Sequence, residues 1–160
     1  MMAQGWHMVS LRGYYEYTID EKGRVNVPAK LRKAAGAESD ELYVITLGLD
    51  QCIYAYPPAQ WTAIEGKLNM LSSDLPEERY YIRTITSHAS DSKLDAQGRI
   101  ALPRMLLDKL GIDKNVIIIG AQDHIEIWKP ETYREYMDKG PGTYEQVAEQ
   151  IFRRKQGPIS

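Results

Sequence analysis

The chain contains the same sequence pattern twice. Residues 17–36 read YTIDEKGRVNVPAKLRKAAG, and residues 92–111 read SKLDAQGRIALPRMLLDKLG. An internal repeat constrains the fold more than any other feature, because each copy must be one small structural unit. Six residues recur at a constant offset of 75 positions: Asp20, Gly23, Arg24, Pro28, Leu31 and Gly36 reappear as Asp95, Gly98, Arg99, Pro103, Leu106 and Gly111.

Each copy predicts a strand, a tight turn, a second strand and a short helix. Residues 15–19 alternate apolar and polar side chains, which indicates a strand with one buried face. The Asp and Gly of residues 20–23 favour a hairpin turn, since Asp bonds the backbone ahead of it and Gly accepts a positive φ. Residues 25–27 predict the return strand. Pro28 ends that strand, and we expect a helix over 29–35 with Gly36 as its stop.

The segments that follow each helix also match between the copies. Strand pairs are expected at 42–47 with 52–56 and at 116–119 with 125–128. In the second strand of each pair the equivalent residues, such as Ile53 and Ile125, are 72 positions apart instead of 75. This offset predicts that the second copy has lost three residues from the loop after its helix. Further helices are expected to start near Pro58 and Pro130 and to cover 59–71, 76–87 (capped by Ser73 or Asp74) and 143–154. Four short strands and one helix cannot bury both sheet faces, so the two copies should pack together with approximate two-fold symmetry.

Overall composition constrains the class of protein. Net charge is −2, which by itself argues against binding a polyanion. The single cysteine, Cys52, excludes an internal disulfide and favours a reducing, cytoplasmic location. No apolar run is long enough to span a membrane, and the N-terminus does not resemble a signal peptide. We expect residues 1–8 to form a loose extension.

Positive charge is concentrated in the two repeated segments. Between Asp20 and Lys33 five cations face two acids, and between Lys93 and Lys109 four cations face two acids. The rest of the chain is therefore acidic. A hairpin that presents Arg beside a basic helix can enter a DNA groove, where the guanidinium grips guanine and Lys meets phosphates. The local charge thus favours nucleic-acid binding despite the acidic total.

The two motifs resemble those of the MraZ family. The resemblance is carried by DEKGRVNVP and DAQGRIALP, joined by PEERYYIRTITSHAS, and it covers about residues 11–138. It implies two tandem SpoVT/AbrB-like domains of the swapped-hairpin type. The expected fold class is therefore α+β, with two tandem swapped-hairpin β-barrel halves, flanking helices and pseudo-two-fold symmetry. The expected bounds are 11–58 for the first domain, 59–90 for linker helices, 91–138 for the second domain and 139–160 for a C-terminal helix and tail.

The resemblance implies a DNA-binding transcriptional regulator. Such a protein would act at its own promoter, ahead of cell-division and cell-wall genes, as a ring-like homo-oligomer on short direct repeats of double-stranded DNA. It would be associated with the nucleoid and would need no cofactor or small-molecule substrate. The family's DNA-contacting arginine falls on Arg24, with Lys22 beside it. In the second motif Ala96 and Gln97 replace the acidic and basic pair, so we expect a lesser role there.

The candidate DNA-binding residues are ranked by motif and charge. Arg24 and Lys22 come first and Arg99 supports them; the others are Lys30, Arg32, Lys33 and Arg104. A structural alternative stays open, in which Arg24 and Arg99 only pair with Asp20 and Asp95. The cations of the first helix could also form just a solvated face.

Other reactive residues favour structural roles. No second His or Cys lies at metal-ligand spacing from His88, so a metal site is not expected, and His88 should anchor a helix end or an intersubunit hydrogen bond. Cys52 is interpreted as a strand residue. Arg79 and Arg83 could contact acids of another subunit or DNA.

Three other functions are alternatives to a DNA-binding regulator. The first is an AbrB-type antitoxin or transition-state regulator, although the roughly 20 residues after Gly140 are short for a toxin-masking tail. The second is an enzyme that uses the His88 region, and no nucleophile on a strained turn supports it. The third is an oligomeric scaffold that does not bind DNA. We therefore expect a regulator and not an enzyme.

Overall fold

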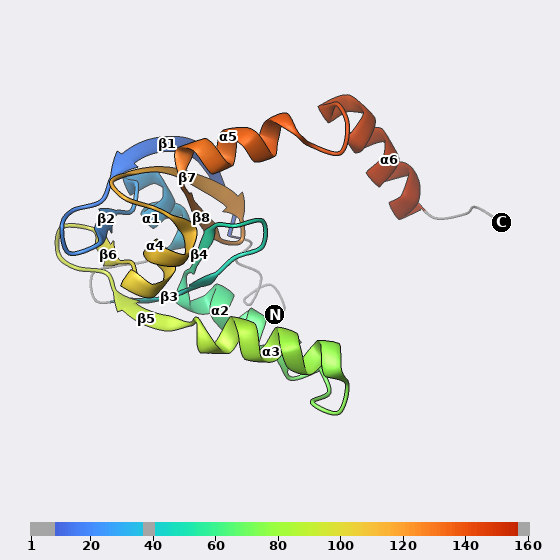
Figure 1. Ribbon diagram of the computed structural model, residues 1–160, viewed down its shortest axis with the longest axis horizontal. Coiled ribbons are helices and arrows are strands. Elements are labelled where there is room, and N and C mark those ends of the chain that lie inside the picture. Colours follow the sequence, from blue (N-terminus) through green and yellow to red (C-terminus); the bar gives the residue numbers. More distant parts are fainter. Residues whose placement is uncertain (1–8, 37–40, 157–160) are drawn as a thin grey trace, which may run out of the picture. The chain divides into compact units, whose positions relative to one another are not determined.

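The computed structural model describes residues 9–36 and 41–156 of the chain (Figure 1). The expected extension at 1–8 lies outside the described residues. The strands are β1 (Leu11–Thr18), β2 (Arg24–Asn26), β3 (Leu42–Leu47), β4 (Ile53–Tyr56), β5 (Ser90–Lys93), β6 (Arg99–Ala101), β7 (Asn115–Gln122) and β8 (Ile125–Trp128). The helices are α1 (Ala29–Ala35), α2 (Pro58–Leu68), α3 (Pro76–Ser87), α4 (Arg104–Leu110), α5 (Pro130–Asp138) and α6 (Tyr144–Gln156).

The predicted turn and helix of each copy are confirmed. Gly23 and Gly98 both have φ of 78°, a left-handed conformation that glycine adopts without strain. Helix α1 covers the predicted 29–35 and ends at Gly36 in the left-handed region, and α4 ends in the same way at Gly111. Strand β1 begins at Leu11, four residues earlier than the alternation at 15–19 indicated. The repeated sequence therefore folds twice into the same local structure.

The strands of the two copies interleave within one sheet. The order of the six-stranded antiparallel sheet is β1-β7-β8-β4-β3-β5, so the first strand of each copy pairs with the third strand of the other. Strands β2 and β6 form a separate two-stranded ribbon, visible at one side of the sheet in Figure 1. The expected mixed α+β fold is thus present.

The expected barrel is not closed in the described part of the chain. Strands β1 and β5 are the two edges of the sheet. The chain leaves the sheet after each of them, because the next strands, β2 and β6, pair with each other instead of extending the ladder. The two expected β-barrel halves therefore do not close into a barrel in the described residues, whereas the mixed α+β character is present.

The pairing register of the strands also corrects the predicted position of the three residues that the second copy lacks. Thr18 pairs with Asn115, and its repeat equivalent Lys93 pairs with Leu42, so Leu42 corresponds to Asn115 at an offset of 73. Only two residues are missing after the helix. The third is missing from the turn between β7 and β8, because the β3–β4 turn is longer and holds Asp50 and Gln51 at positive φ.

A single hydrophobic core joins both copies. Val25 and Leu31 of the first copy and Ile100 and Leu106 of the second are at most 1% exposed and belong to one cluster with residues of the six-stranded sheet. Equivalent side chains from the two copies therefore pack together, as the need to bury both sheet faces requires. The compact unit formed in this way ends at Pro130.

Helices α2 and α3 pack against β3. Ile85 is the buried residue of α3, and the buried Thr46 hydroxyl donates a 2.8 Å hydrogen bond to its carbonyl. The predicted cap of α3 at Ser73 or Asp74 is wrong. The N-cap is Leu75, without a side-chain hydrogen bond, and Glu78 accepts a 2.8 Å hydrogen bond from the Ser72 N–H, which lies ahead of the helix.

Two further predictions about helix ends are confirmed. His88 caps α3, and its Nδ1 donates a 2.7 Å hydrogen bond to the Thr84 carbonyl. In the second compact unit, α6 begins after Thr143, whose hydroxyl and N–H exchange 3.1 Å hydrogen bonds with Gln146 in a capping box.

Among the described helices, none combines the length and the apolar character that crossing a bilayer requires.

Candidate nucleic-acid interface

Asp20 organises the first turn through three hydrogen bonds. Its Oδ1 accepts from the backbone N–H groups of Lys22 (2.9 Å) and Arg24 (2.8 Å), and its Oδ2 accepts from the Arg24 Nε at 2.7 Å. The first two bonds close the turn around Gly23. The third orients the Arg24 guanidinium, leaving its terminal nitrogens without a hydrogen-bond partner among the described residues.

The second turn reproduces this arrangement. Asp95 Oδ1 accepts from the N–H groups of Gln97 and Arg99, and Oδ2 accepts from the Arg99 Nε, all at 2.9 Å. Each arginine thus pairs with the aspartate of its own turn, as the structural alternative anticipated. This pairing uses Nε only, so the terminal nitrogens of each guanidinium take no part in it.

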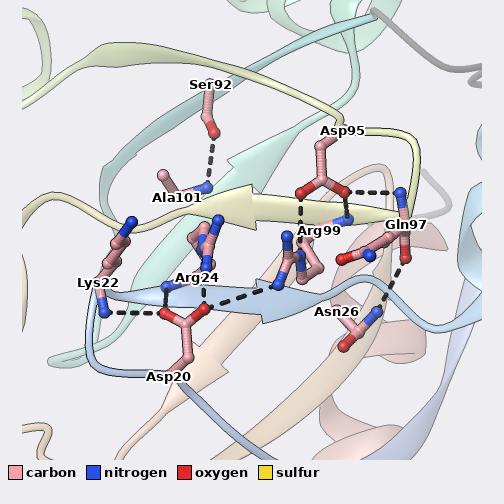
Figure 2. Close-up of polar contacts among 9 residues, drawn as sticks. All are labelled: Asp20, Lys22, Arg24, Asn26, Ser92, Asp95, Gln97, Arg99 and Ala101. Atoms are coloured by element: carbon pink, nitrogen blue, oxygen red, sulfur yellow. Dashed lines mark hydrogen bonds and ion pairs between the residues drawn. The ribbon is translucent and has the colours of Figure 1, made fainter.

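The two turns are tied to each other through the β2–β6 ribbon. Val25 pairs with Ile100 at its centre, and each strand continues into a bond with the opposite turn: Val27 N–H donates to the Gly98 carbonyl, and Leu102 N–H donates to that of Gly23, both at 2.8 Å. Figure 2 shows the two aspartate–arginine pairs on neighbouring strands, with the Asn26 amide donating to the Gln97 carbonyl. The turns therefore form one rigid element.

The arginines differ in their surroundings. The Arg99 Nη1 lies 3.8 Å from Asp20 Oδ2, so this guanidinium is shared between the acids of both turns. Its side chain is 25% exposed, and that of Arg24 is 35% exposed. Arg24 is consequently the more accessible of the two for a ligand.

Hydrogen bonding keeps both turn aspartates ionised. The backbone N–H of Arg24 is the largest cause that lowers the pKa of Asp20, and the Arg24 side chain adds to it against the opposing effect of burial. The backbone N–H and side chain of Arg99 lower the pKa of Asp95 in the same way. At neutral pH each turn therefore carries an ionised Asp–Arg pair.

The first turn borders an open hollow of about 770 Å³. Four cations line it: Lys22 and Arg24 of the first copy, and Arg104 and Lys114 of the second. Arg104 is well exposed and lies 3.9 Å from Asp108, one turn along α4. The structure thus brings three of the predicted residues together at one site.

The remaining predicted residues lie on α1. Lys30 and Lys33 are exposed. Arg32 is half-buried, its Nε donates a 3.0 Å hydrogen bond to the Val27 carbonyl, and its guanidinium lies against Gly98 of the second turn. Arg32 therefore supports the second turn, whereas its repeat equivalent, Leu107, lies beside Gly23 of the first.

Sequence reasoning missed Lys114. The charge count stopped at the end of the second helix, whereas Lys114 lies just before β7 and its carbonyl accepts a 2.8 Å hydrogen bond from the Ile19 N–H beside the first turn. Alignment of β3 with β7 at an offset of 73 places Lys114 opposite Glu41, and this difference in charge is the signal that points to Lys114.

The other reactive groups have structural surroundings. Burial raises the pKa of the Cys52 thiol, whose Sγ lies 3.1 Å from the Leu49 carbonyl. The Arg79 guanidinium donates to the Ser73 carbonyl at 2.9 Å. Over residues 9–36 and 41–156, no group of three or more His, Cys, Asp or Glu is placed to hold a metal ion.

Comparison with known proteins identifies a family for both copies. The model described as "MraZ protein, putative antitoxin-like" matches residues 10–84 and again residues 85–155. The two matches together span most of the chain and meet at residues 84 and 85, within the last turn of α3, in agreement with the internal repeat.

Curated relatives are similar over nearly their whole length. Proteins named transcriptional regulator MraZ from Syntrophomonas wolfei and Natranaerobius thermophilus are each 40% identical over 139 residues, which is 87% of this chain and 94% of the relative. The one from Heliobacterium modesticaldum is 39% identical over 140 residues, covering 88% and 95%. A solved structure, PHS018 from Pyrococcus horikoshii, covers 73% of this chain and 87% of its own at 16% identity, and its TM-score of 0.30 is too low to support an argument.

Proposed function

The chain belongs to the MraZ family of transcriptional regulators, and from this membership we propose that it binds double-stranded DNA at short direct repeats in its own promoter. It acts there as a repressor of a cell-division and cell-wall gene cluster, in association with the nucleoid. The observation that carries the proposal is the β2–β6 ribbon, which holds two arginine-bearing turns side by side and leaves Arg24 accessible. We assign Arg24 and Lys22 the main contacts and Arg99 a supporting one.

The chemistry of the first turn suits a DNA groove. A two-stranded ribbon fits the major groove, where an arginine fork can bind the O6 and N7 of guanine. Arg24 uses its Nε for Asp20, so its terminal nitrogens supply the fork. The exposed Lys22 is placed for a phosphate, which a flexible ammonium binds as a point charge.

One turn offers few contacts, so the proposal includes a ring-like homo-oligomer. Linking several turns on one assembly increases the effective concentration of each and raises the affinity by about 10²–10⁴ fold. We also interpret the exchange of first strands between the copies, β1 to β7 and β5 to β3, as the swapped-hairpin arrangement of SpoVT/AbrB-like domains with the bounds given above.

A gel-shift assay tests the proposal. The probe is a labelled duplex of the region upstream of the protein's own gene, and a shuffled duplex of the same composition is the reference. Wild type is expected to shift the first probe selectively, and Arg24→Ala is expected to lose that selectivity. Lys67→Ala, which removes an exposed cation from α2, serves as the matched control and should bind as wild type.

The salt dependence gives a second readout. If phosphates are contacted, the affinity falls steeply as salt rises, because bound counterions are released. Equal binding of both duplexes by wild type, or unchanged selectivity of Arg24→Ala, would refute the proposal.

An antitoxin is the second candidate, since the matched family description itself contains the term antitoxin-like. Such a protein would bind a small toxic ribonuclease in addition to DNA. Expression of the chain with its genomic neighbours, followed by affinity purification, distinguishes the two. Stoichiometric recovery of a ribonuclease would favour the antitoxin, and recovery of the chain alone would favour the regulator.

A further inference from the structure

The two turns have nearly the same backbone but different charged neighbours. The cation Lys22 of the first turn corresponds to the neutral Gln97 of the second, at the repeat offset of 75. Arg104, which borders the first turn from the start of α4, corresponds in the same way to Ala29 at the start of α1. At both positions a cation is present only beside the first turn.

A third position shows a reversal of charge. The Lys114 carbonyl accepts a 2.8 Å hydrogen bond from Ile19 N–H, just before the first turn. The Glu41 carbonyl accepts a bond of the same length from Leu94 N–H, just before the second turn. Lys114 and Glu41 therefore occupy equivalent places, with a cation beside one turn and an acid beside the other.

We infer that Arg104 and Lys114 of the second copy complete the DNA contact of the first turn by binding a phosphate, and that the second turn acts chiefly as a brace. This inference rests on the proposed function and adds the residues that make the two turns unequal. The hollow that these cations share with Lys22 and Arg24 is the phosphate site.

The charge of the hollow limits what it binds. Asp20, Glu21 and Asp113 also line it, so its four cations leave a small positive excess. Asp20 is already bonded to Arg24. A small excess suits one phosphate group flanking the base that Arg24 contacts, and not a long run of the DNA backbone. At the second turn the cation that lies beside the turn in addition to Arg99 is Arg32, which is half-buried and donates a hydrogen bond to the Val27 carbonyl.

Fluorescence anisotropy with the labelled upstream duplex tests the inference. Lys114→Ala and Arg104→Ala are each expected to weaken binding several-fold. Each is also expected to make the slope of log K against the logarithm of the salt concentration less steep, by about 0.9 for each first turn that contacts DNA. Neither change removes a backbone hydrogen bond, since Lys114 supports the turn through its carbonyl. Lys67→Ala is again the control, and circular dichroism verifies that each variant is folded.

A gain-of-charge variant tests the other half of the inference. Glu41→Lys with Gln97→Lys gives the second turn the charges of the first and is expected to tighten binding and steepen the salt slope. If wild type binds selectively but Lys114→Ala and Arg104→Ala match it, the inference is overturned while the proposed function stands. If wild type shows no selective binding, the proposed function itself fails.

Discussion

The Nη1 of Arg99 lies 3.8 Å from Oδ2 of Asp20, so a guanidinium of the second copy helps to neutralise the acid of the first. The reverse contact, from Arg24 to Asp95, is not formed within 4 Å among the described residues. The two arginines of a symmetric motif consequently differ in their surroundings: Arg99 is held between two carboxylates, and Arg24 has a freer guanidinium.

Arg24→Ala is expected to affect mainly DNA selectivity, and Arg99→Ala is expected to affect mainly the stability of the fold. Arg24→Ala should cost about 1–3 kcal/mol of base discrimination, the value of one bidentate contact, with little change in melting temperature. Arg99→Ala should lower the melting temperature more, because it removes the link between the turns. Anisotropy and thermal unfolding measured on the same samples give both quantities. A larger loss of selectivity for Arg99→Ala than for Arg24→Ala would contradict the assignment.

Gly23→Ala is expected to destabilise the protein more than Gly36→Ala. Both glycines have positive φ, where an alanine costs about 1–2 kcal/mol. At Gly23 the added Cβ would also lie 3.0 Å from the Leu102 carbonyl oxygen, whereas at Gly36 it would meet no atom of the described residues within 4 Å. Chemical denaturation of the two variants measures the difference, and equal losses would show that the contact with Leu102 is unimportant.

His124→Gln is expected to change how stability depends on pH. The His124 Nδ1 lies 2.7 Å from Asp123 Oδ1, its Nε2 lies 3.0 Å from Glu126 Oε2, and its ring stacks on Tyr54 with centroids 4.1 Å apart. Burial lowers the pKa of His124, but the hydrogen bonds to the two acids outweigh it and raise the pKa above its ordinary value.

The stabilisation from His124 is therefore complete below the ordinary pKa of histidine, about 6.5, and is lost as pH rises through the higher folded value. Melting temperatures of wild type and His124→Gln, measured from mildly acidic to alkaline pH, should converge as the pH rises. A difference that stays constant or widens with pH would exclude a protonated His124 in the folded state.

Tyr43→Phe is expected to preserve or increase stability. The Tyr43 side chain is fully buried, its hydroxyl has no hydrogen-bond partner among the described residues, and burial raises its pKa to about 12. An unsatisfied buried hydroxyl costs about 1–3 kcal/mol, and phenylalanine removes it without changing the ring. Urea unfolding measures the effect. A clear loss of stability would reveal a partner for the hydroxyl, and Tyr43→Val, which matches the equivalent Val116, shows the separate cost of losing the ring.

Much of the local structure was predictable from the sequence. The Asp and Gly of each turn, the proline before each helix and the glycine after it act over a few residues, so helix α1 and both turns formed where expected. The cap of α3 was predicted wrongly, because the helix begins directly after Leu75, and the N–H groups of Ser72 and Asp74 ahead of it are bonded to Glu78 and to the Ser72 hydroxyl.

The sequence alone determined that there are two copies of one unit, the chemistry of their turns and the family to which they belong, because these depend on residue identity and short spacing. The tertiary structure decided which strands pair across the copies, that the sheet stays open, and that Arg104 and Lys114 lie beside the first turn. These features bring together residues that are far apart in the sequence, from 45 positions for Ile45 and Ser90 to 111 for Leu11 and Gln122. Such contacts depend on how two amphipathic copies bury their faces against each other, and no local pattern in either copy specifies them.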